Sequence, residues 1–266
     1  MSTFAGALFD RLSSRNALPL FLILAAGMPA RAQSAQEIMQ KVDQQARSAS
    51  EQYTGNLEVY DRGGKVLKKS WDTWRKGFGG DSRALVRFTS PPEVKGVGLL
   101  LLSHPAAPSD QWLYTPAIRR DRRIAPQDRS VRFLGTDFSY EDMQERDVND
   151  SSYELLGEET QESRIFYKVK AVPKPALRSQ YSYYYLWVDS ATFVVTRMEF
   201  YKDREWVKTL TASGFQKIQG IWTALRLEMK DLKRGSRTVI EMSDIQYNKP
   251  LSDDLFTLRT LRNSDQ

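Results

Sequence analysis

Four arginines gather within five residues of the stretch WLYTPAIRRDRRIAP, residues 112–126. Planar guanidinium groups form paired hydrogen bonds with phosphate and carboxylate groups. Arg119, Arg120, Arg122 and Arg123 are therefore candidates for docking an anionic headgroup, a membrane surface or an acidic partner. The alternative is a solvated loop whose charges pair with the acidic run that follows, where each exposed pair stabilises by only about 0 to 1 kcal/mol.

Acidic side chains are the second candidate for chemistry. Residues 135–162 contain ten carboxylates and one basic residue, Arg146. Asp137 with Glu141 or Asp142 supplies the residue types of two-carboxylate hydrolysis. We favour the alternative of an acidic helix face, because carboxylates in a first turn are stabilised by the helix dipole. An exported hydrolase acting through these three residues is the weakest functional alternative.

Other catalytic groups are scarce. The chain has no cysteine, and its one histidine, His104, follows an apolar run. Catalytic triads and transition-metal sites combine several such side chains. The short GVG at residues 96–98 does not form a dinucleotide loop, and no phosphate-binding loop is present. We therefore expect no catalytic residue, no metal and no cofactor.

The first 32 residues have the pattern of a secretory signal peptide. Arg11 and Arg15 precede the apolar run ALPLFLILAAG, and ARA at residues 30–32 offers small residues for cleavage. We expect cleavage near Ala32 and an exported product of one domain, residues 33–266. Without those 32 residues, 36 basic residues face 32 acidic ones, so the charge is patchy and does not favour nucleic acid.

The remaining chain reads as one helix followed by many strands. Ser34 and Glu37 have capping-box spacing, and apolar residues then recur at helical intervals to Ala49. From Tyr53 the period changes to two, and the glycine pair in RGGK predicts a hairpin turn. The predicted strands are residues 53–61, 66–74, 83–90, 97–103, 111–116, 122–126, 153–159, 164–172, 181–189, 193–202, 206–218, 223–231 and 237–248. Residues 135–148, GTDFSYEDMQERDV, are expected to form a short helix or an ordered loop.

Several of these strands are apolar on both faces. The run GVGLLLL and the run YSYYYLWVD carry large side chains at both parities, which is more apolar surface than a strand with one wet face needs. The alternative is an ordinary packed core with surface tyrosines. The candidate walls of an apolar cavity are Leu99, Leu101, Trp112, Tyr114, Tyr183, Tyr185 and Trp187.

The combination of a signal peptide, a helix, serial hairpins, WLYTPAIRRDRRI, GTDFSYEDM and a closing PLSDDLFTL resembles the outer-membrane lipoprotein-sorting proteins, the LolA-like group. Within it, the chain is most similar to the branch associated with RND or MMPL-type inner-membrane exporters. The resemblance implies a mainly β fold with a few helices, in which a curved antiparallel half-barrel of about eleven strands has helices covering its concave face. It also implies one arginine inside the cavity, which no single position of this chain matches.

As function, the resemblance implies a periplasmic carrier without catalysis. Such a carrier holds acyl chains of a lipid or lipoprotein and passes them from inner-membrane machinery, of RND/MMPL or ABC type, to an outer-membrane acceptor. The alternative is a non-carrier partner of an RND/MMPL-type exporter, whose interior is filled with side chains.

Overall fold

The architecture follows from alternating strands joined by tight turns, in a computed structural model that describes residues 33–263. The predicted signal peptide and its cleavage site lie outside the described residues. The strands are β1 (Ser50–Tyr60), β2 (Val66–Phe78), β3 (Asp81–Ser90), β4 (Gly98–His104), β5 (Ala107–Thr115), β6 (Arg120–Arg123), β7 (Ser151–Gln161), β8 (Arg164–Pro173), β9 (Tyr183–Asp189), β10 (Val195–Lys202), β11 (Glu205–Ser213), β12 (Gln216–Ile218), β13 (Ile221–Thr223), β14 (Arg226–Asp231) and β15 (Ser236–Tyr247). The α-helices are α1 (Ala35–Ala46) and α2 (Leu258–Arg262), and the short 3-10 helices are η1 (Pro116–Ile118), η2 (Pro126–Asp128), η3 (Val148–Asp150), η4 (Pro175–Leu177) and η5 (Asp253–Phe256).

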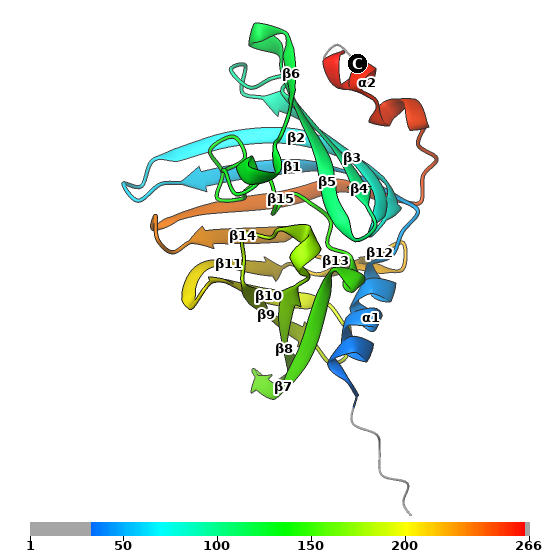
Figure 1. The fold of residues 1–266 in the computed structure, drawn as a ribbon, viewed down its shortest axis with the longest axis vertical. Helices are drawn as coiled ribbons and strands as arrows, with labels where there is room; N and C mark the ends of the chain where they lie inside the picture. The colour runs from blue at the N-terminus through cyan, green and yellow to red at the C-terminus, as the bar shows by residue number, and fades with distance from the viewer. Residues whose placement is uncertain (1–32, 264–266) are drawn as a thin grey trace, which may run out of the picture. The chain divides into compact units, whose positions relative to one another are not determined.

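Thirteen strands form one curved antiparallel sheet (Figure 1). Their order is β6-β5-β4-β3-β2-β1-β15-β14-β11-β10-β9-β8-β7, so most neighbours are joined by hairpins, and β1 pairs with β15 to connect the two halves. The strands β6 and β7 are free edges, and the sheet does not close into a barrel. The half-barrel prediction is confirmed, but eleven strands was too few. Each of the thirteen segments chosen from alternation contains a strand of the main sheet. The single strand predicted over residues 206–218 is wrong in its last part, because the chain turns there and β12 pairs with β13 in a separate two-stranded sheet.

The predicted N-terminal helix and first hairpin are confirmed. Ser34 caps α1 by accepting from the Glu37 amide at 3.2 Å, and the Glu37 carboxylate accepts from the Ser34 amide at 2.8 Å. In the turn between β1 and β2, the Lys65 amide donates to the Asp61 carboxylate, and Gly64 adopts a positive φ of 83°. This left-handed conformation favours glycine, which explains the glycine pair.

The main hydrophobic core lies on the concave face of the sheet. Apolar residues of α1 and of the segment 124–150, which crosses in front of the sheet in Figure 1, pack there against the strands. At its centre, Trp71 meets Phe88 edge to face with centroids 5.4 Å apart, and Phe133 of the crossing segment lies 5.7 Å from Phe88. Gly55 leaves room for the indole, since a Cβ there would approach Trp71 Nε1 to 2.2 Å.

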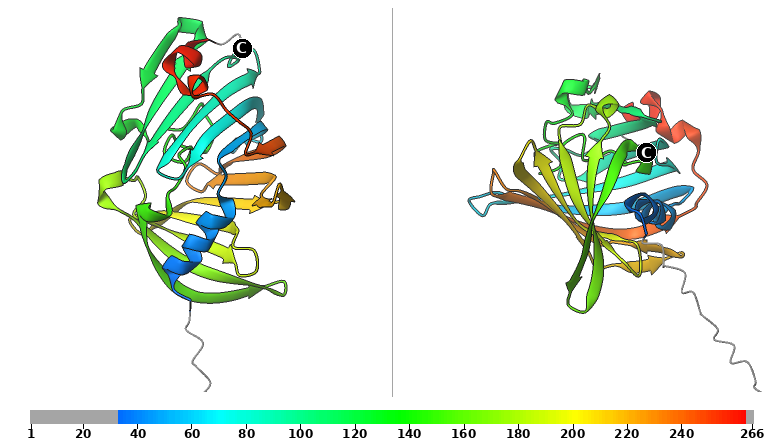
Figure 2. Two further views of the ribbon diagram at one scale, coloured as in Figure 1. Left: turned by 90° about the vertical axis from the view of Figure 1, so that its right-hand side faces the viewer. Right: turned by 60° about the horizontal axis from the view of Figure 1, so that its bottom comes forward.

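The C-terminal helix α2 covers the opposite, outer face, which the sequence did not predict. It packs near β4 and β5, whereas α1 lies beside β7 and β13 (Figure 2). Leu261 of α2 is completely buried in a second apolar cluster with Leu100 and Tyr114, where Gly98 leaves space for its side chain. Buried Arg87 donates to the carbonyls of Thr260 and Leu261 at 2.7 and 3.2 Å and so satisfies the end of this short helix.

This packing predicts that the variant Leu261→Ala loses about 2 to 5 kcal/mol of unfolding free energy, because a cavity replaces a fully buried side chain. Urea denaturation monitored by tryptophan fluorescence measures the loss. The control is Ile118→Ala, since Ile118 is 65% exposed and its truncation leaves no cavity. Equal midpoints for the two variants would show that α2 does not stabilise the outer face.

Candidate functional site

A cavity of about 420 Å³ opens on the concave side of the sheet. This volume is within the usual range for small-molecule sites, roughly 300 to 1,000 Å³. Its walls come from β1 to β4, β13 to β15 and the segment 124–150, which are far apart in the sequence. Apolar side chains on these walls include Val86, Leu101, Met143, Ile221, Leu227 and Met242.

A buried ion-pair group forms one side of this cavity. Arg75 of β2 donates from Nη2 to Ser48 Oγ at 2.7 Å and to Glu51 Oε2 at 3.1 Å, and it also donates to the Gly77 carbonyl. Glu145 of the crossing segment places Oε1 4.0 Å from Arg75 Nε. Its other oxygen, Oε2, is buried without a hydrogen-bond partner. Burial raises the pKa of Glu145, although the nearby Arg75 charge opposes the rise.

Two tyrosines add hydroxyl groups to the same wall. Burial raises the pKa of Tyr53 and of Tyr247 to about 12. Both phenols therefore stay neutral near pH 7. Tyr247 Oη is bonded to Thr223 Oγ1 at 2.8 Å, which fixes the ring against β13. The cavity thus combines an apolar wall with a fixed polar end, the usual composition of a site for an amphipathic ligand.

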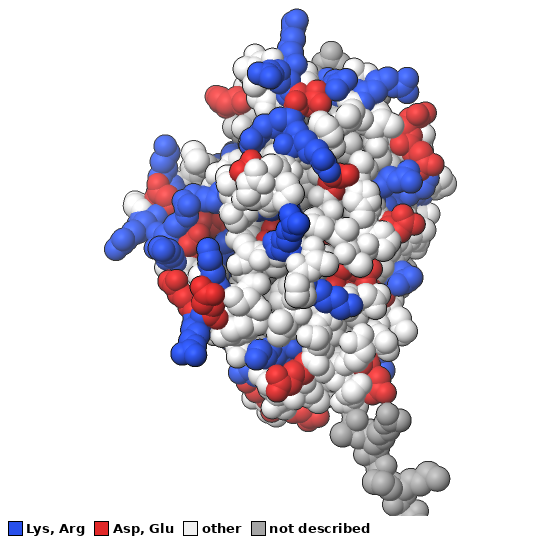
Figure 3. Space-filling view, viewed as in Figure 1, with Lys and Arg blue, Asp and Glu red and all other residues white. Residues whose placement is uncertain are grey.

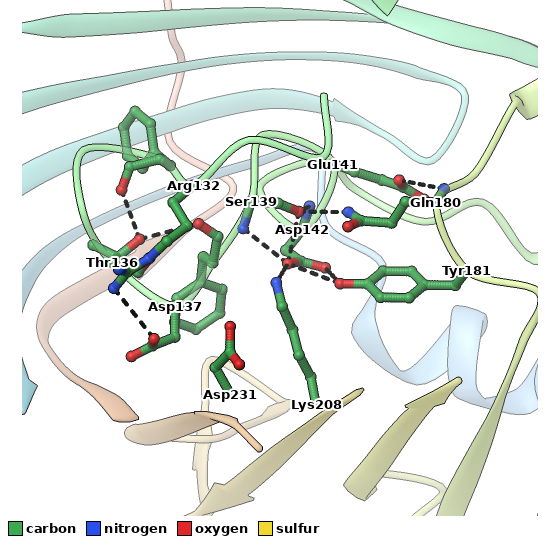
Figure 4. Close-up of polar contacts among 12 residues, drawn as sticks. Arg132, Thr136, Asp137, Ser139, Glu141, Asp142, Gln180, Tyr181, Lys208 and Asp231 are labelled. Atoms are coloured by element: carbon green, nitrogen blue, oxygen red, sulfur yellow. Dashed lines mark hydrogen bonds and ion pairs between the residues drawn. The ribbon is translucent and has the colours of Figure 1, made fainter. Parts of the chain in front are cut away.

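The crossing segment is fixed to the sheet by the buried carboxylate of Asp142, drawn in Figure 4. Lys208 Nζ of β11 donates to Asp142 Oδ2 at 2.8 Å, and Tyr181 Oη donates to Oδ1 at 2.8 Å. The Ser139 amide and hydroxyl complete the shell at 2.9 and 2.8 Å. Burial alone would raise the pKa of Asp142, but Lys208 and Arg146 outweigh it and lower the pKa. Asp142 is therefore charged and fully bonded.

Asp137 provides a second attachment. Its side chain is fully buried and accepts from Thr238 Oγ1 at 2.8 Å and Ser236 Oγ at 2.6 Å, both on β15, with Arg132 at 3.3 Å. Glu141 accepts from the Gln180 amide at 2.9 Å and from the Ser179 hydroxyl. All three carboxylates proposed for hydrolysis thus accept hydrogen bonds that hold this segment in place. The segment is an ordered loop, so the alternative of an acidic helix face does not apply.

The seven predicted cavity residues are divided between the two faces of the sheet. Leu99 and Leu101 face the concave core, and Leu101 borders the cavity. Trp112 and Tyr114 belong to the cluster around Leu261 on the outer face.

The aromatic strand β9 shows the same division. Tyr184, Leu186 and Val188 are in the concave core. The other parity, which contains Tyr183, Tyr185 and Trp187, contacts outer-face groups such as Tyr201 and Glu159. A role for these three in ligand binding stays a prediction.

The predicted arginine cluster lies at the free edge of the sheet. Arg119 links η1 to β6 with a φ of 49°, and both Arg119 and Arg120 are exposed without an ion pair among the described residues. Arg123 is bonded to Asp110, while Asp121 between the arginines binds Arg262 of α2 at 2.8 Å. No ion pair joins these four arginines to residues 135–162 within the described chain. Their role in docking stays a prediction.

His104 is not grouped with metal-ligating side chains. Its Nε2 lies 3.1 Å from Asp110 Oδ2 at the exposed turn between β4 and β5. Among residues 33–263, no group of three or more His, Cys, Asp or Glu side chains is placed to hold a metal ion.

Sequence reasoning missed Arg75 and Glu145, which together with Glu51 are the charged residues bordering the cavity. A signal for Arg75 was present, because it shares the parity of Trp71 and Thr73, both buried, on a strand whose other parity is more exposed. A charged residue at a core-facing position indicates a buried partner or a site. Glu145 carries no comparable signal, because it belongs to a loop without periodicity.

The described residues form a half-barrel with a covered concave cavity, and known structures share the half-barrel fold. A DUF1329 family protein from Desulfovibrio piger is 32% identical with a TM-score of 0.81, covering 85% of this chain and 97% of that one. A putative outer-membrane lipoprotein-sorting protein domain from Vibrio parahaemolyticus is 24% identical (TM-score 0.81; 86% and 98% covered), and a LolA superfamily protein from Nitrosomonas europaea is 23% identical (0.70; 85% and 99%).

A family model described as "Uncharacterized protein" matches residues 80–263, more than half of the chain. No curated protein matches the chain. The chain therefore belongs to the DUF1329 family, and it has the fold of the LolA-like outer-membrane lipoprotein-sorting proteins, the group that its sequence motifs predicted. Its assignment to the branch associated with RND/MMPL-type exporters stays a prediction.

We expect the variant Asp142→Asn to lose about 3 to 5 kcal/mol of unfolding free energy, because buried Lys208 loses its counter-charge. Chemical denaturation near pH 7 measures this loss. Asp253→Asn is the matched control, since Asp253 pairs with Lys76 and Arg83 in an exposed position, and its removal should leave the midpoint unchanged. A loss as small as that of the control would show that Asp142 does not anchor the segment.

The raised pKa of Glu145 predicts a specific pH dependence. Its contribution to stability is complete below its ordinary pKa of 4.5 and is lost as the pH rises through the raised pKa of the folded state. The variant Glu145→Gln should therefore gain stability relative to the parent chain as the pH rises from about 5 to 7. Thermal unfolding across this range tests it, with exposed Glu93→Gln as the control. Parallel curves for the parent chain and Glu145→Gln would contradict the inference.

Proposed function

We propose that this chain is a periplasmic carrier or accessory protein that takes acyl chains of a lipid or lipoprotein into its concave cavity. It would receive them from inner-membrane machinery and pass them to an outer-membrane acceptor. The observation that carries this proposal is the cavity of about 420 Å³ with an apolar wall and a buried charged end. Among residues 33–263, no helix is long and apolar enough to cross a membrane.

The physical reason for such a cavity is the cost of moving an acyl chain through water. Burial is worth about 0.8 kcal/mol per methylene, so a lipid leaves a bilayer only when another apolar surface replaces it. Val86, Leu101 and Leu227 provide part of that surface. The guanidinium of Arg75 offers a charged contact for the polar end of the cargo, next to the Glu145 carboxylate, which burial makes easier to protonate.

The segment 124–150 would act as the lid of this cavity. Met143, Gln144 and Glu145 border the cavity, and the same segment is attached to the sheet one position earlier through Asp142. Opening therefore has to move the residues beside a buried ion pair. Contact with an acceptor at the exposed arginines Arg119 and Arg120, or at the tyrosines on the outer face, would provide the signal for release.

A specific observation favours a second candidate, a partner of an RND/MMPL-type exporter that carries nothing. Much of the concave face is packed solid, with Trp71, Phe88 and Phe133 in mutual contact under the crossing segment. Such a protein would be captured by an exporter through its arginine edge and would bind no acyl probe.

Filling the cavity separates the two candidates. Ala84 of β3 borders the cavity, so Ala84→Phe should weaken binding of a fluorescent fatty-acid probe about tenfold or more by occupying its space. Met242→Trp repeats the test from another wall. Ala191→Phe is the control, because Ala191 is exposed in the turn after β9.

Native mass spectrometry and organic extraction of the gently purified chain should also show a bound acyl species. Absence of that species, with no probe binding by the parent chain, would favour the exporter partner. Probe binding unchanged in both filled variants would place the ligand outside this cavity.

A further inference from the structure

A second hollow, a groove of about 340 Å³, lies at the other end of β1 from the cavity. Three parts of the chain form it: the turn between β1 and β2, the turn between β14 and β15, and the crossing segment at Arg132 and Gly135. The two turns touch, since Arg62 Cδ would lie 3.7 Å from a Cβ placed on Gly235. We call this hollow the basic groove.

Four cations border the basic groove, and two of them have no ion pair with any residue of 33–263. Arg132 is bonded to Asp137 and to backbone carbonyls, and Arg234 lies 3.4 Å from Asp231. Arg62 and Lys65 form no ion pair among the described residues. The Asp61 carboxylate between them accepts from the Lys65 amide, so part of its charge is used within the turn.

The surrounding residues strengthen the positive field. Residues 60–69 and 228–237 together contain eight basic side chains and three acidic ones. Figure 3 shows lysines and arginines gathered around the ends of these hairpins. Lys69 donates to the Leu134 carbonyl, and burial followed by the Arg132 charge lowers its pKa, as expected where cations are crowded.

Exposed apolar side chains flank the same groove. Val66 and Leu67 of the β1–β2 hairpin are 39% and 48% exposed, and Leu232 of the neighbouring turn is 42% exposed. Leu67 borders the groove directly. Large aliphatic side chains at the tips of two adjacent basic turns are unusual for a purely solvated edge, and they fit the boundary between headgroups and acyl chains of a bilayer.

We propose that the basic groove docks this protein onto membranes by binding the phosphate headgroup of an anionic phospholipid, with Leu67 and its apolar neighbours entering the interface. Arg62 and Lys65 supply the unpaired charges, and Arg132 and Arg234 supply fixed donors on the opposite wall. The groove has the volume of a small ligand site, and its sign is complementary to a phosphate. The chain thereby gains a membrane-facing surface separate from the arginine edge at β6.

This inference goes beyond the proposed carrier function and does not depend on it. The basic groove shares none of its lining residues with the concave cavity. A variant that loses the groove should keep its affinity for the fatty-acid probe, and a filled cavity should leave membrane docking unchanged. Failure of one idea is therefore distinguishable from failure of the other.

Vesicle binding by the full chain tests the docking surface. The double variant Arg62→Gln with Lys65→Gln should weaken co-sedimentation with vesicles of 70% phosphatidylcholine and 30% phosphatidylglycerol by roughly thirty-fold, the effect of two cations near an anionic surface. The matched control is Arg119→Gln with Arg120→Gln, which removes the same charge from the β6 edge and should weaken binding much less. Inorganic phosphate at millimolar concentration should compete weakly, because it lacks the apolar contact.

Labelling locates the contact independently, because the chain has no cysteine of its own. An environment-sensitive dye on Leu67→Cys should shift to the blue when anionic vesicles are added, whereas the same dye on Ile118→Cys at the other edge should not. A shift at position 118 alone, or equal loss of binding in the two double variants, would overturn the assignment. Absence of vesicle binding by the parent chain, or full competition by free phosphate, would also overturn it.

Discussion

The buried carboxylate of Asp142 holds together a fold whose sheet leaves both of its edges open. A sheet that does not close exposes its concave apolar face, and a separate piece of chain has to cover that face. Here the cover is the segment 124–150, which is not a strand of the main sheet, so side-chain attachments to the sheet have to hold it over that face. Asp142 with Lys208 and Tyr181, and Asp137 with Thr238, provide them. The charge of Asp142 is compensated by Lys208, which is nearly as buried, and by the partly exposed Arg146. Removing Asp142 would leave the buried Lys208 without its counter-charge.

The same attachment determines where a ligand can bind. Because the segment is fixed at Asp137 and Asp142, its aromatic part with Phe133 and Tyr140 fills the centre of the concave face. Free volume appears beyond the attachments, among other places in the cavity beside Arg75 and in the basic groove beside Arg132. The two hollows differ in chemistry, since one is mainly apolar with a buried ion pair and the other is open and cationic. The proposed carrier function would use the first hollow, and the proposed membrane docking would use the second.

Prediction from the sequence succeeded where the signal was local. The capping box at Ser34, the glycine turn at Gly64 and all thirteen alternating segments of the main sheet depend on neighbours a few residues apart. Prediction from the sequence was less successful for strands that are apolar on both faces. The alternation in YSYYYLWVD separates the side chains into two sets but does not tell which set faces the concave side of the sheet. Turning the strand over exchanges the two sets without changing the pattern. The structure places Tyr184, Leu186 and Val188 inside, and the C-terminal helix covers a face that the sequence had left open.

The sequence by itself therefore determined the order of elements, the mainly β class and, through its motifs, the family. Only the tertiary structure decided that Arg75 and Glu145 meet, that the carboxylates of GTDFSYEDM serve as attachments, and that Arg62 and Arg132 share a groove. The physical reason is the separation along the chain. Alternation and turn chemistry act over a few residues, whereas an ion pair between residues 142 and 208 exists only after the strands between them have paired in register.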